Sequence, residues 1–131
     1  MQGDGKDDRM GNLLNWYEIP AADFARAVNF YETILGINIH VQEMNGMKVG
    51  YMPQQGDAVG GAIMAGPGQS PSGSGITIYF KAGSDLAVPL ARVQPAGGQI
   101  IMPKTLVSKQ IGHIALFHDT EGNRVGLHSM D

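Results

Sequence analysis

The sequence predicts an α+β fold made of two similar units, each a strand, a helix and three further strands. Apolar residues alternate in the predicted strands and recur with a period of about 3.6 in the predicted helices, once in each half of the chain. A Gly/Ser/Pro-rich segment, residues 66–75, divides the halves. The helix landmarks Asp23 and Gly36 recur as Ser84 and Gly97 after the same 61 residues (84 − 23 and 97 − 36), which indicates an internal duplication.

The first strand of the first unit should lie within residues 14–20. Residues 1–11 hold five charges and only two apolar residues, both Met, and predict a disordered tail before a folded domain over residues 12–131. Alternation in the strand points Tyr17 and Ile19 toward the core, and Trp16 and Glu18 toward the opposite face.

The rest of the first unit, which spans residues 12–65, should be a helix and three strands. "DFARAVNFYETILG" places apolar residues at helical spacing, with Asp23 as N-cap and Gly36 as a left-handed C-cap. Strand-like runs follow at residues 37–44, 47–53 and 60–66, and Asn-Gly between the first two predicts a hairpin turn.

The second unit, residues 76–131, repeats this order after the linker of residues 66–75. Residues 76–83 predict a strand with Thr77, Tyr79 and Lys81 on one face. A capped helix should follow over residues 84–97, with an irregular start because Pro89 lacks an N–H. Three closing strands are expected at residues 99–103, 113–119 and 124–129.

Composition and charge exclude several classes of function. The net charge is −3, and nine Lys and Arg residues form no basic stripe, so we expect no nucleic-acid partner. No apolar run approaches the ~20 residues of a spanning helix, and the first residues lack a signal-peptide core, so we expect no membrane partner and a cytoplasmic location. With no cysteine, only His, Asp and Glu remain as strong metal ligands.

Two stretches resemble the vicinal oxygen chelate superfamily, which includes glyoxalase I, extradiol dioxygenases, and fosfomycin- and bleomycin-resistance proteins. These are "WYEIPAADFARAVNFYETILG", residues 16–36, and "DTEGNRVGLHS", residues 119–129, which is similar to the family's "DPxGN" turn and final strand. The resemblance implies two βαβββ modules whose mixed sheet curls around a cleft. It also implies a homodimer and metal ligands on the concave strand faces.

The residues at the inherited ligand positions do not suit a metal. The family's first-strand His falls on Trp16, and the equivalent position in the second half is Thr77. The final-strand Glu falls on Gly126, and the remaining ligand falls within residues 60–64, "GGAIM". Because these side chains coordinate hard cations weakly or not at all, we predict no metal and no other cofactor, with a divalent metal as the alternative.

Glu18 and His128 are the candidate catalytic residues. Alternation places Arg124, Gly126 and His128 on the cleft face of the last strand, so His128 and Glu18 could meet across the cleft. A His and a carboxylate can act as an acid/base pair or supply two ligands of a metal site. A functional metal site usually needs about three protein ligands, and here the sequence supplies only two.

Six further residues are predicted to bind the ligand: Trp16, Thr77, Tyr79, Lys81, Leu116 and Arg124. Trp16 could stack on a planar ligand or only fill space in the core. Lys81 and Arg124 could hold an anionic group or be solvated surface residues. Leu116 lies on the cleft face because its neighbours in the strand alternate away from it.

The remaining His, Asp and Asn residues have structural interpretations. His113 should face away from the cleft with its neighbours Ala115 and Phe117, and His118 should bond to the turn that follows it. His40 has no expected partner. Asp119, Gly122 and Asn123 should build that turn, since Asp and Asn accept local backbone bonds and Gly permits a positive φ.

The function that best fits these observations is a glyoxalase-like or bleomycin-resistance-like protein that binds a small organic molecule in the cleft without metal. The alternative is a lyase, isomerase or dioxygenase that uses Glu18 and His128. A third hypothesis is a structural or regulatory partner protein. Whether the chain is an enzyme is left open by the sequence, because fold does not determine function.

Overall fold

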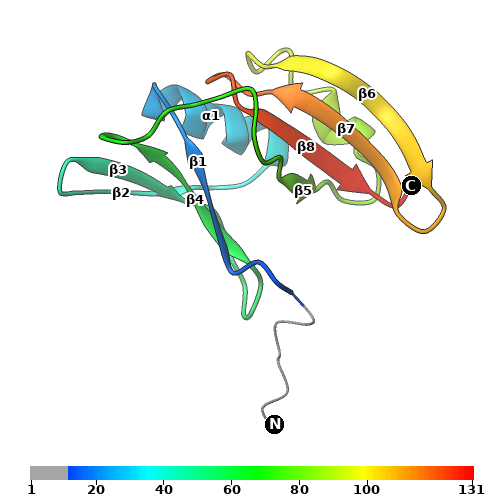
Figure 1. Ribbon diagram of the computed structural model, residues 1–131, viewed down its shortest axis with the longest axis horizontal. Helices are drawn as coiled ribbons and strands as arrows, with labels where there is room; N and C mark the ends of the chain where they lie inside the picture. The colour runs from blue at the N-terminus through cyan, green and yellow to red at the C-terminus, as the bar shows by residue number, and fades with distance from the viewer. Residues whose placement is uncertain (1–11) are drawn as a thin grey trace, which may run out of the picture.

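The computed structural model describes residues 12–131, and the predicted tail at residues 1–11 lies outside this range. Both halves of the chain form a mixed four-stranded sheet (Figure 1). The first sheet has the order β1-β4-β3-β2, with the bounds β1 Trp16–Pro20, β2 His40–Met44, β3 Met47–Tyr51 and β4 Gly60–Ala65. The second has the order β5-β8-β7-β6, with the bounds β5 Tyr79–Lys81, β6 Gln99–Ser108, β7 Gly112–His118 and β8 Arg124–Ser129.

The two sheets share one pairing pattern, which confirms the α+β fold of two βαβββ units. β1 is parallel to β4 and β5 is parallel to β8, while the remaining neighbours are antiparallel. The Asn45-Gly46 turn joins β2 and β3 with positive φ at both residues, as the hairpin prediction requires. β5 is shorter than predicted, although bonds from Gly126 to Ile78 and from Ala82 to His128 extend its pairing with β8.

The first helix, α1 (Phe24–Leu35), begins and ends at the predicted residues. The Asp23 carboxylate accepts a hydrogen bond from the Arg26 N–H at 3.1 Å, which satisfies a donor that the first turn leaves free. Gly36 has φ +64° and donates its N–H to the Glu32 carbonyl, so the helix ends in a left-handed cap. The local sequence is therefore sufficient to define both ends of α1.

The second helix is much shorter than the predicted range of residues 84–97. α2 comprises only Ala87–Leu90, and turns lead from it to Gly97. Ser84 does not cap it; instead the Asp85 carboxylate accepts the Ala87 N–H at 2.9 Å. Pro89 and Pro95 each remove a backbone donor within six residues of one another, so no regular helix of several turns can form here.

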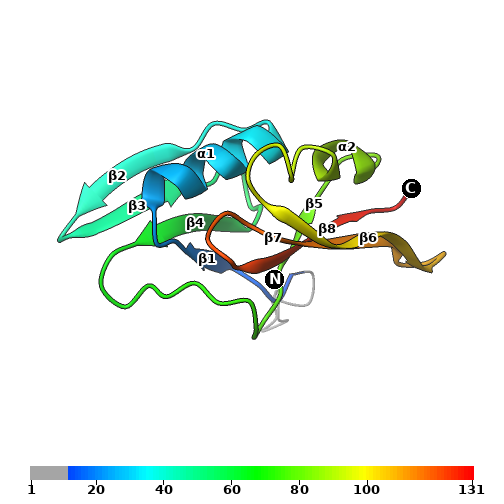
Figure 2. The ribbon, with the colours of Figure 1, turned by 90° about the horizontal axis from the view of Figure 1, so that it is seen from above.

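Both helices lie on the same side of the two sheets (Figure 2). One apolar core fills the space between helices and sheets and draws residues from both halves of the chain. Four rings form its centre, with centroids 5.0 to 5.9 Å apart between neighbours: Phe30, Tyr31, Phe80 and Phe117. The two units therefore form a single core, and the opposite side of each sheet carries no helix.

No helix within residues 12–131 has the length and apolar character needed to cross a membrane.

Candidate functional site

The candidate site is the open face, defined here as the side of both sheets that faces away from α1 and α2. Strand register places the predicted residues on it, because side chains of paired residues point to the same side of a sheet. Trp16 and Glu18 are paired with Gly60 and Ala62 in the first sheet. In the second sheet the residues on this face include Tyr79, Leu116, Arg124, Gly126 and His128.

Three aromatic rings follow one another across the open face of the first sheet. The Trp16 and Tyr51 ring centroids lie 6.4 Å apart with the rings edge-on, and the His40 ring lies 6.4 Å from Tyr51 and nearly parallel to it. Trp16 is 45% exposed. The sequence predicted Trp16 here but gave no role to Tyr51 or His40, because only the β2–β3–β4 register places them beside it.

The position on β4 that is paired with Trp16 is a glycine, Gly60. A Cβ built at Gly60 would lie 2.9 Å from the indole and 2.6 Å from Oε1 of Gln54, so only glycine allows both groups to approach this closely. Gln54 in turn donates a hydrogen bond to the Ala58 carbonyl at 2.6 Å. The indole therefore approaches the backbone of β4 closely at Gly60 and still exposes part of its surface to solvent.

Among residues 12–131, the one hydrogen-bond partner of the Glu18 carboxylate is Trp16. Nε1 of Trp16 donates to Oε2 of Glu18 at 3.2 Å, between two exposed side chains on the same strand. This contact holds the indole and the carboxylate together at the edge of the first sheet. No group within residues 12–131 binds Oε1 of Glu18, so this oxygen can accept a donor from a ligand.

Tyr79 is the corresponding aromatic residue of the second sheet. Its ring covers Gly126 on β8 so closely that a Cβ at Gly126 would overlap the ring. Tyr79 is 45% exposed, and Leu116 is paired with Gly126 on the far side of β8. Each sheet therefore exposes an aromatic ring that lies over a glycine of the neighbouring strand.

Arg124 and Thr77, both predicted ligand-binding residues, bond to each other and to the linker. Nε of Arg124 donates to Oγ1 of Thr77 at 2.8 Å, and Nη2 donates to the Gly75 carbonyl at 2.9 Å. The linker is also held by the Ser72 N–H, which donates to Oδ1 of Asn123 at 3.0 Å. Arg124 thus anchors the linker at one end of the open face, and only its remaining donors are available to an anion.

Within residues 12–131 no hydrogen bond joins Glu18 and His128. They lie on different sheets, and His128 donates from Nε2 to the Ile111 carbonyl while Glu18 binds Trp16. His113 lies on the core side and its Nδ1 is 3.3 Å from the Met130 carbonyl. His118 is paired with Arg124 on the open face, beside Gly73 of the linker. The catalytic Glu18–His128 pair stays a prediction.

One hollow of about 320 Å³ lies on the helix side of the molecule, between the end of α1 and the start of α2. Its lining includes Ile34, Leu35, Lys81, Val88 and Arg92. Nη1 of Arg92 donates a hydrogen bond to the Ile34 carbonyl at 3.4 Å, in the last turn of α1. Lys81, which was predicted to bind the ligand, is paired with His128 and so belongs to the open face by register, although it also contributes to the rim of this hollow at the edge of the second sheet.

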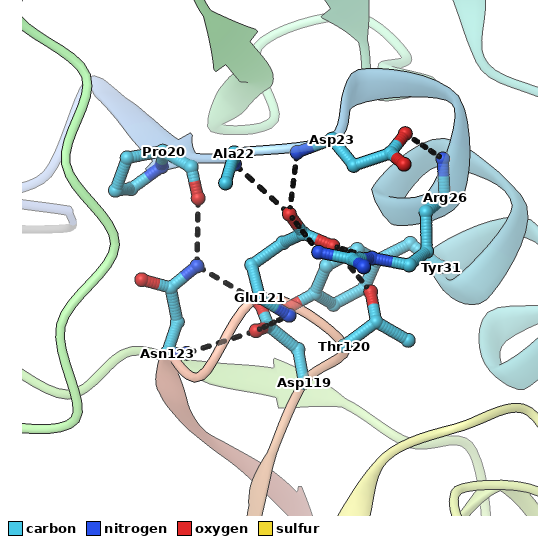
Figure 3. A network of polar contacts seen from close by, with 9 residues as sticks. All are labelled: Pro20, Ala22, Asp23, Arg26, Tyr31, Asp119, Thr120, Glu121 and Asn123. Carbon is cyan, nitrogen blue, oxygen red and sulfur yellow. Dashed lines mark hydrogen bonds and ion pairs between the residues drawn. The ribbon is translucent and has the colours of Figure 1, made fainter.

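The turn between β7 and β8 forms the densest polar network of the described chain (Figure 3). Oδ1 of Asp119 accepts the backbone N–H groups of Glu121 and Asn123, both at 2.9 Å, and Gly122 has φ +88°. Oδ2 of Asp119 accepts the Tyr31 hydroxyl at 2.7 Å and Nδ2 of Asn123 at 3.0 Å. Asp119, Gly122 and Asn123 therefore build the turn, as predicted.

Glu121 connects this turn to the first unit, a role that the sequence did not indicate. Its Oε1 accepts the N–H groups of Ala22 and Asp23 at 2.9 and 2.7 Å, and Nε of Arg26 donates to its Oε2 at 2.7 Å. Asn123 adds a bond from Nδ2 to the Pro20 carbonyl at 2.7 Å. The second unit thus supplies acceptors to the start of α1 and a donor to the end of β1.

Glu121 is held as a carboxylate at unusually low pH. Burial by itself raises the pKa of its carboxyl, but hydrogen bonds from Arg26, from the Asp23 N–H and from Thr120 outweigh burial. Together with the charge of Arg26 they lower the pKa from 4.5 to about 2. The Glu121 side chain is fully buried, whereas that of Arg26 is 51% exposed.

This depressed pKa makes part of the stability depend on pH. Because the folded-state pKa lies below the unfolded value, the stabilisation is complete above about pH 4.5 and is lost as the pH falls toward 2. We expect Glu121→Gln to lower the free energy of unfolding by about 2 kcal/mol at neutral pH, allowing for solvent screening at Arg26. Urea denaturation of both proteins at several pH values should show this difference shrinking below pH 4.5. A difference that stays constant would contradict the assignment.

Comparison with known proteins identifies the family. The family model described as Glyoxalase/Bleomycin resistance protein/Dioxygenase superfamily matches residues 13–127. The chain belongs to this superfamily. This confirms the resemblance carried by residues 16–36 and 119–129, while no curated protein matches the chain.

Several members of this superfamily have similar solved structures. A glyoxalase I variant from Zea mays gives a TM-score of 0.70 at 17% identity over 88% of this chain, which spans only 46% of the maize chain. A glyoxalase/bleomycin resistance protein from Streptomyces sp. CB03234 gives a TM-score of 0.64 at 23% identity, and the match covers 88% of this chain and 99% of the Streptomyces chain. TnmS3, an antibiotic binding protein from the same Streptomyces, gives a TM-score of 0.61 at 22% identity, and the match covers 88% of this chain and 93% of TnmS3. These identities establish a shared fold.

The family's metal-ligand positions do not fit a metal in this chain. Register pairs Trp16 with Gly60, and Thr77 is bonded to Arg124, so neither strand pair offers an imidazole or a carboxylate at these positions. At Gly126 the Tyr79 ring occupies the space that a longer side chain would need. Within residues 12–131 no three His, Asp or Glu side chains cluster closely enough to hold an ion.

Proposed function

We propose that this superfamily member binds a planar aromatic molecule on the open face, without the family's metal. The observation that carries the proposal is the pair of partly exposed aromatic rings, Trp16 and Tyr79, each lying over a glycine of the neighbouring strand. Large exposed rings on a surface built from small residues offer wide contact area at little entropic cost. The Trp16–Tyr51–His40 row extends this surface across the first sheet.

The charged groups at this face favour a ligand with both apolar and polar parts. Within residues 12–131, Oε1 of Glu18 has no partner beside the indole, and Arg124 has donors beyond those that bind Thr77 and Gly75. A planar ring can stack against Trp16 or Tyr79 while its substituents bond to these groups. The similarity to an antibiotic binding protein is consistent with binding of a small organic molecule.

The protein is further proposed to be a homodimer. Large apolar side chains are exposed just before β1, just after the linker and on the β6–β7 hairpin, namely Leu13, Leu14, Ile76, Ile101, Leu106, Val107 and Ile111. Monomeric proteins rarely expose apolar surface this extensively, and a second copy would cover it. A dimer would also cover part of the open face.

The proposal is tested on untagged protein in one series of measurements. We expect light scattering to give the mass of a dimer, and a panel of planar aromatic acids and amines to quench the fluorescence of Trp16, the chain's only tryptophan. Metal content by plasma mass spectrometry should be well below one ion per chain. Stoichiometric metal, or a thermal shift with Zn²⁺, Mn²⁺, Fe²⁺ or Ni²⁺ that His128→Ala abolishes, would overturn the metal-free proposal.

A further inference from the structure

The two sheets are held beside each other without a shared strand ladder. In the described part of the chain β1 and β5 are edge strands of separate sheets, each paired on one side only. The relative orientation of the sheets therefore depends on the common core and on polar side-chain contacts. Apolar burial has little directional preference, whereas hydrogen bonds constrain distance and angle.

The polar contacts between the units concentrate at the ends of the two strands that carry the candidate site. Asn123, which binds the Pro20 carbonyl, directly precedes Arg124 at the start of β8. Pro20 is the last residue of β1 and lies two positions beyond Glu18. Glu121 accepts the backbone N–H groups of Ala22 and Asp23, and two nitrogens of Arg26 donate to its carboxylate at 2.7 and 3.1 Å.

We propose that Glu121 is a positioning residue that sets β1 against β8, and with them the two aromatic halves of the open face. This inference rests on the proposed ligand-binding function. The bidentate pair with Arg26 fixes the direction from which the turn approaches α1, because a guanidinium and a carboxylate match in one plane. Trp16 and Glu18 then keep a constant separation from Tyr79 and Arg124.

The chain offers a matched control for this role. Asp85 pairs with Lys104 at 2.8 Å and accepts the Ala87 N–H at the start of α2, so it also combines an ion pair with a helix-start contact. All of these partners lie within the second unit. Asp85→Asn therefore removes a comparable charge without touching the contacts between the units.

The test uses the single tryptophan as donor and an introduced cysteine as acceptor site. Because the chain has no cysteine, Gln99→Cys on the exposed edge of the second sheet can carry one dansyl group. Time-resolved Förster energy transfer from Trp16 to the dansyl group reports the distribution of distances between the two sheets. The labelled chain is mixed with excess unlabelled Trp16→Phe protein, so that a labelled chain in a dimer pairs with a chain that has neither donor nor acceptor. The measured energy transfer then occurs within one chain.

We expect Glu121→Gln to broaden this distance distribution at a temperature where the variant is fully folded, while Asp85→Asn leaves it unchanged. The affinity for 2-naphthoate, measured by calorimetry, should fall about three- to tenfold in Glu121→Gln and stay constant in Asp85→Asn. An unchanged distribution in Glu121→Gln, or equal broadening in Asp85→Asn, would overturn the positioning role.

Failure of the ligand proposal would be distinguishable from failure of the positioning role. If the distribution broadens in Glu121→Gln but 2-naphthoate and the wider panel bind neither protein, the positioning role stands and the proposed function fails. If Glu121→Gln does not fold, Arg26→Gln keeps the carboxylate and removes only the bidentate pair. That variant should broaden the distribution relative to the wild type, and no broadening would overturn the proposal.

Discussion

Asp119→Ala is expected to lower the free energy of unfolding by about 4 kcal/mol, because hydrogen bonds to a buried charged group contribute about 1.5 to 3 kcal/mol each and are not additive. Asp119 is only 4% exposed and its carboxylate accepts four hydrogen bonds. Alanine leaves all four donors without an acceptor. Two of the donor residues, Tyr31 and Asn123, are themselves buried, so water cannot replace the lost acceptor at low cost.

Two further variants separate this effect from a general loss of surface charge. Tyr31→Phe removes one donor and leaves Asp119 with three hydrogen bonds, so we expect the free energy of unfolding to fall by about 1.5 kcal/mol. Asp57→Ala, in an exposed loop, should change the stability by less than about 0.5 kcal/mol. Urea denaturation, monitored by far-ultraviolet circular dichroism, measures the free energy of unfolding of all three variants. If Asp119→Ala behaved like Asp57→Ala, the turn would not hold the two units together.

The cost of Asp119→Ala also bears on how the units cooperate. Tyr31 lies in α1 and Asp119 in the second unit, so their bond crosses between the halves of the chain. Burial and the neighbouring carboxylate both raise the pKa of Tyr31, which keeps its hydroxyl protonated and able to donate. Loss of this bond should affect unfolding of both halves together, and a single transition at lower urea concentration is the expected form of the curve.

Local signals explain why much of the fold was predictable. The alternation of Trp16, Tyr17, Glu18 and Ile19, and the caps Asp23 and Gly36, act over a few residues, and the structure confirms each. The same holds for the Asn-Gly hairpin. The predicted length of the helix at residues 84–97 was wrong. The duplication aligned its two ends with those of α1, but the helix-breaking effect of the two prolines between them was underestimated.

The parts that could not be predicted depend on contacts between residues far apart in the chain. Glu121 bonds to backbone groups 98 and 99 residues away, and nothing in "DTEGN" indicates which donors its carboxylate will meet. Tyr51 joins Trp16 only through the register of β3 on β4. Arg124 was placed on the correct face, but its use in holding the linker depends on where residues 72–77 cross the sheet.

Trp16→Ala is expected to weaken binding of a planar aromatic ligand at least tenfold while costing about 1 kcal/mol of stability. Tenfold corresponds to about 1.4 kcal/mol, the size of one aromatic stacking contact with part of its buried area. The stability cost is small because almost half of the indole is already exposed and its hydrogen bond to Glu18 is on the surface. Calorimetry with 2-naphthoate measures the affinity, since the variant has no tryptophan.

Val88→Ala is the matched control, because Val88 is 55% exposed but lies in α2 on the helix side. It should leave the affinity unchanged. A stability loss of about 3 to 5 kcal/mol in Trp16→Ala would identify the indole as core filler and contradict the ligand role. Unchanged affinity at unchanged stability would exclude Trp16 from both roles and leave Tyr79 as the only predicted aromatic contact.

Tyr51→Ala then decides how far the ligand surface extends. Tyr51 contacts the edge of Trp16 and stacks with His40, so it either supports the indole or touches the ligand itself. If it only supports Trp16, the double variant Trp16→Ala/Tyr51→Ala should bind no more weakly than Trp16→Ala alone. If both rings touch the ligand, the two losses should add, because each removes a separate contact. The cycle therefore separates a single aromatic contact from a surface that spans the first sheet.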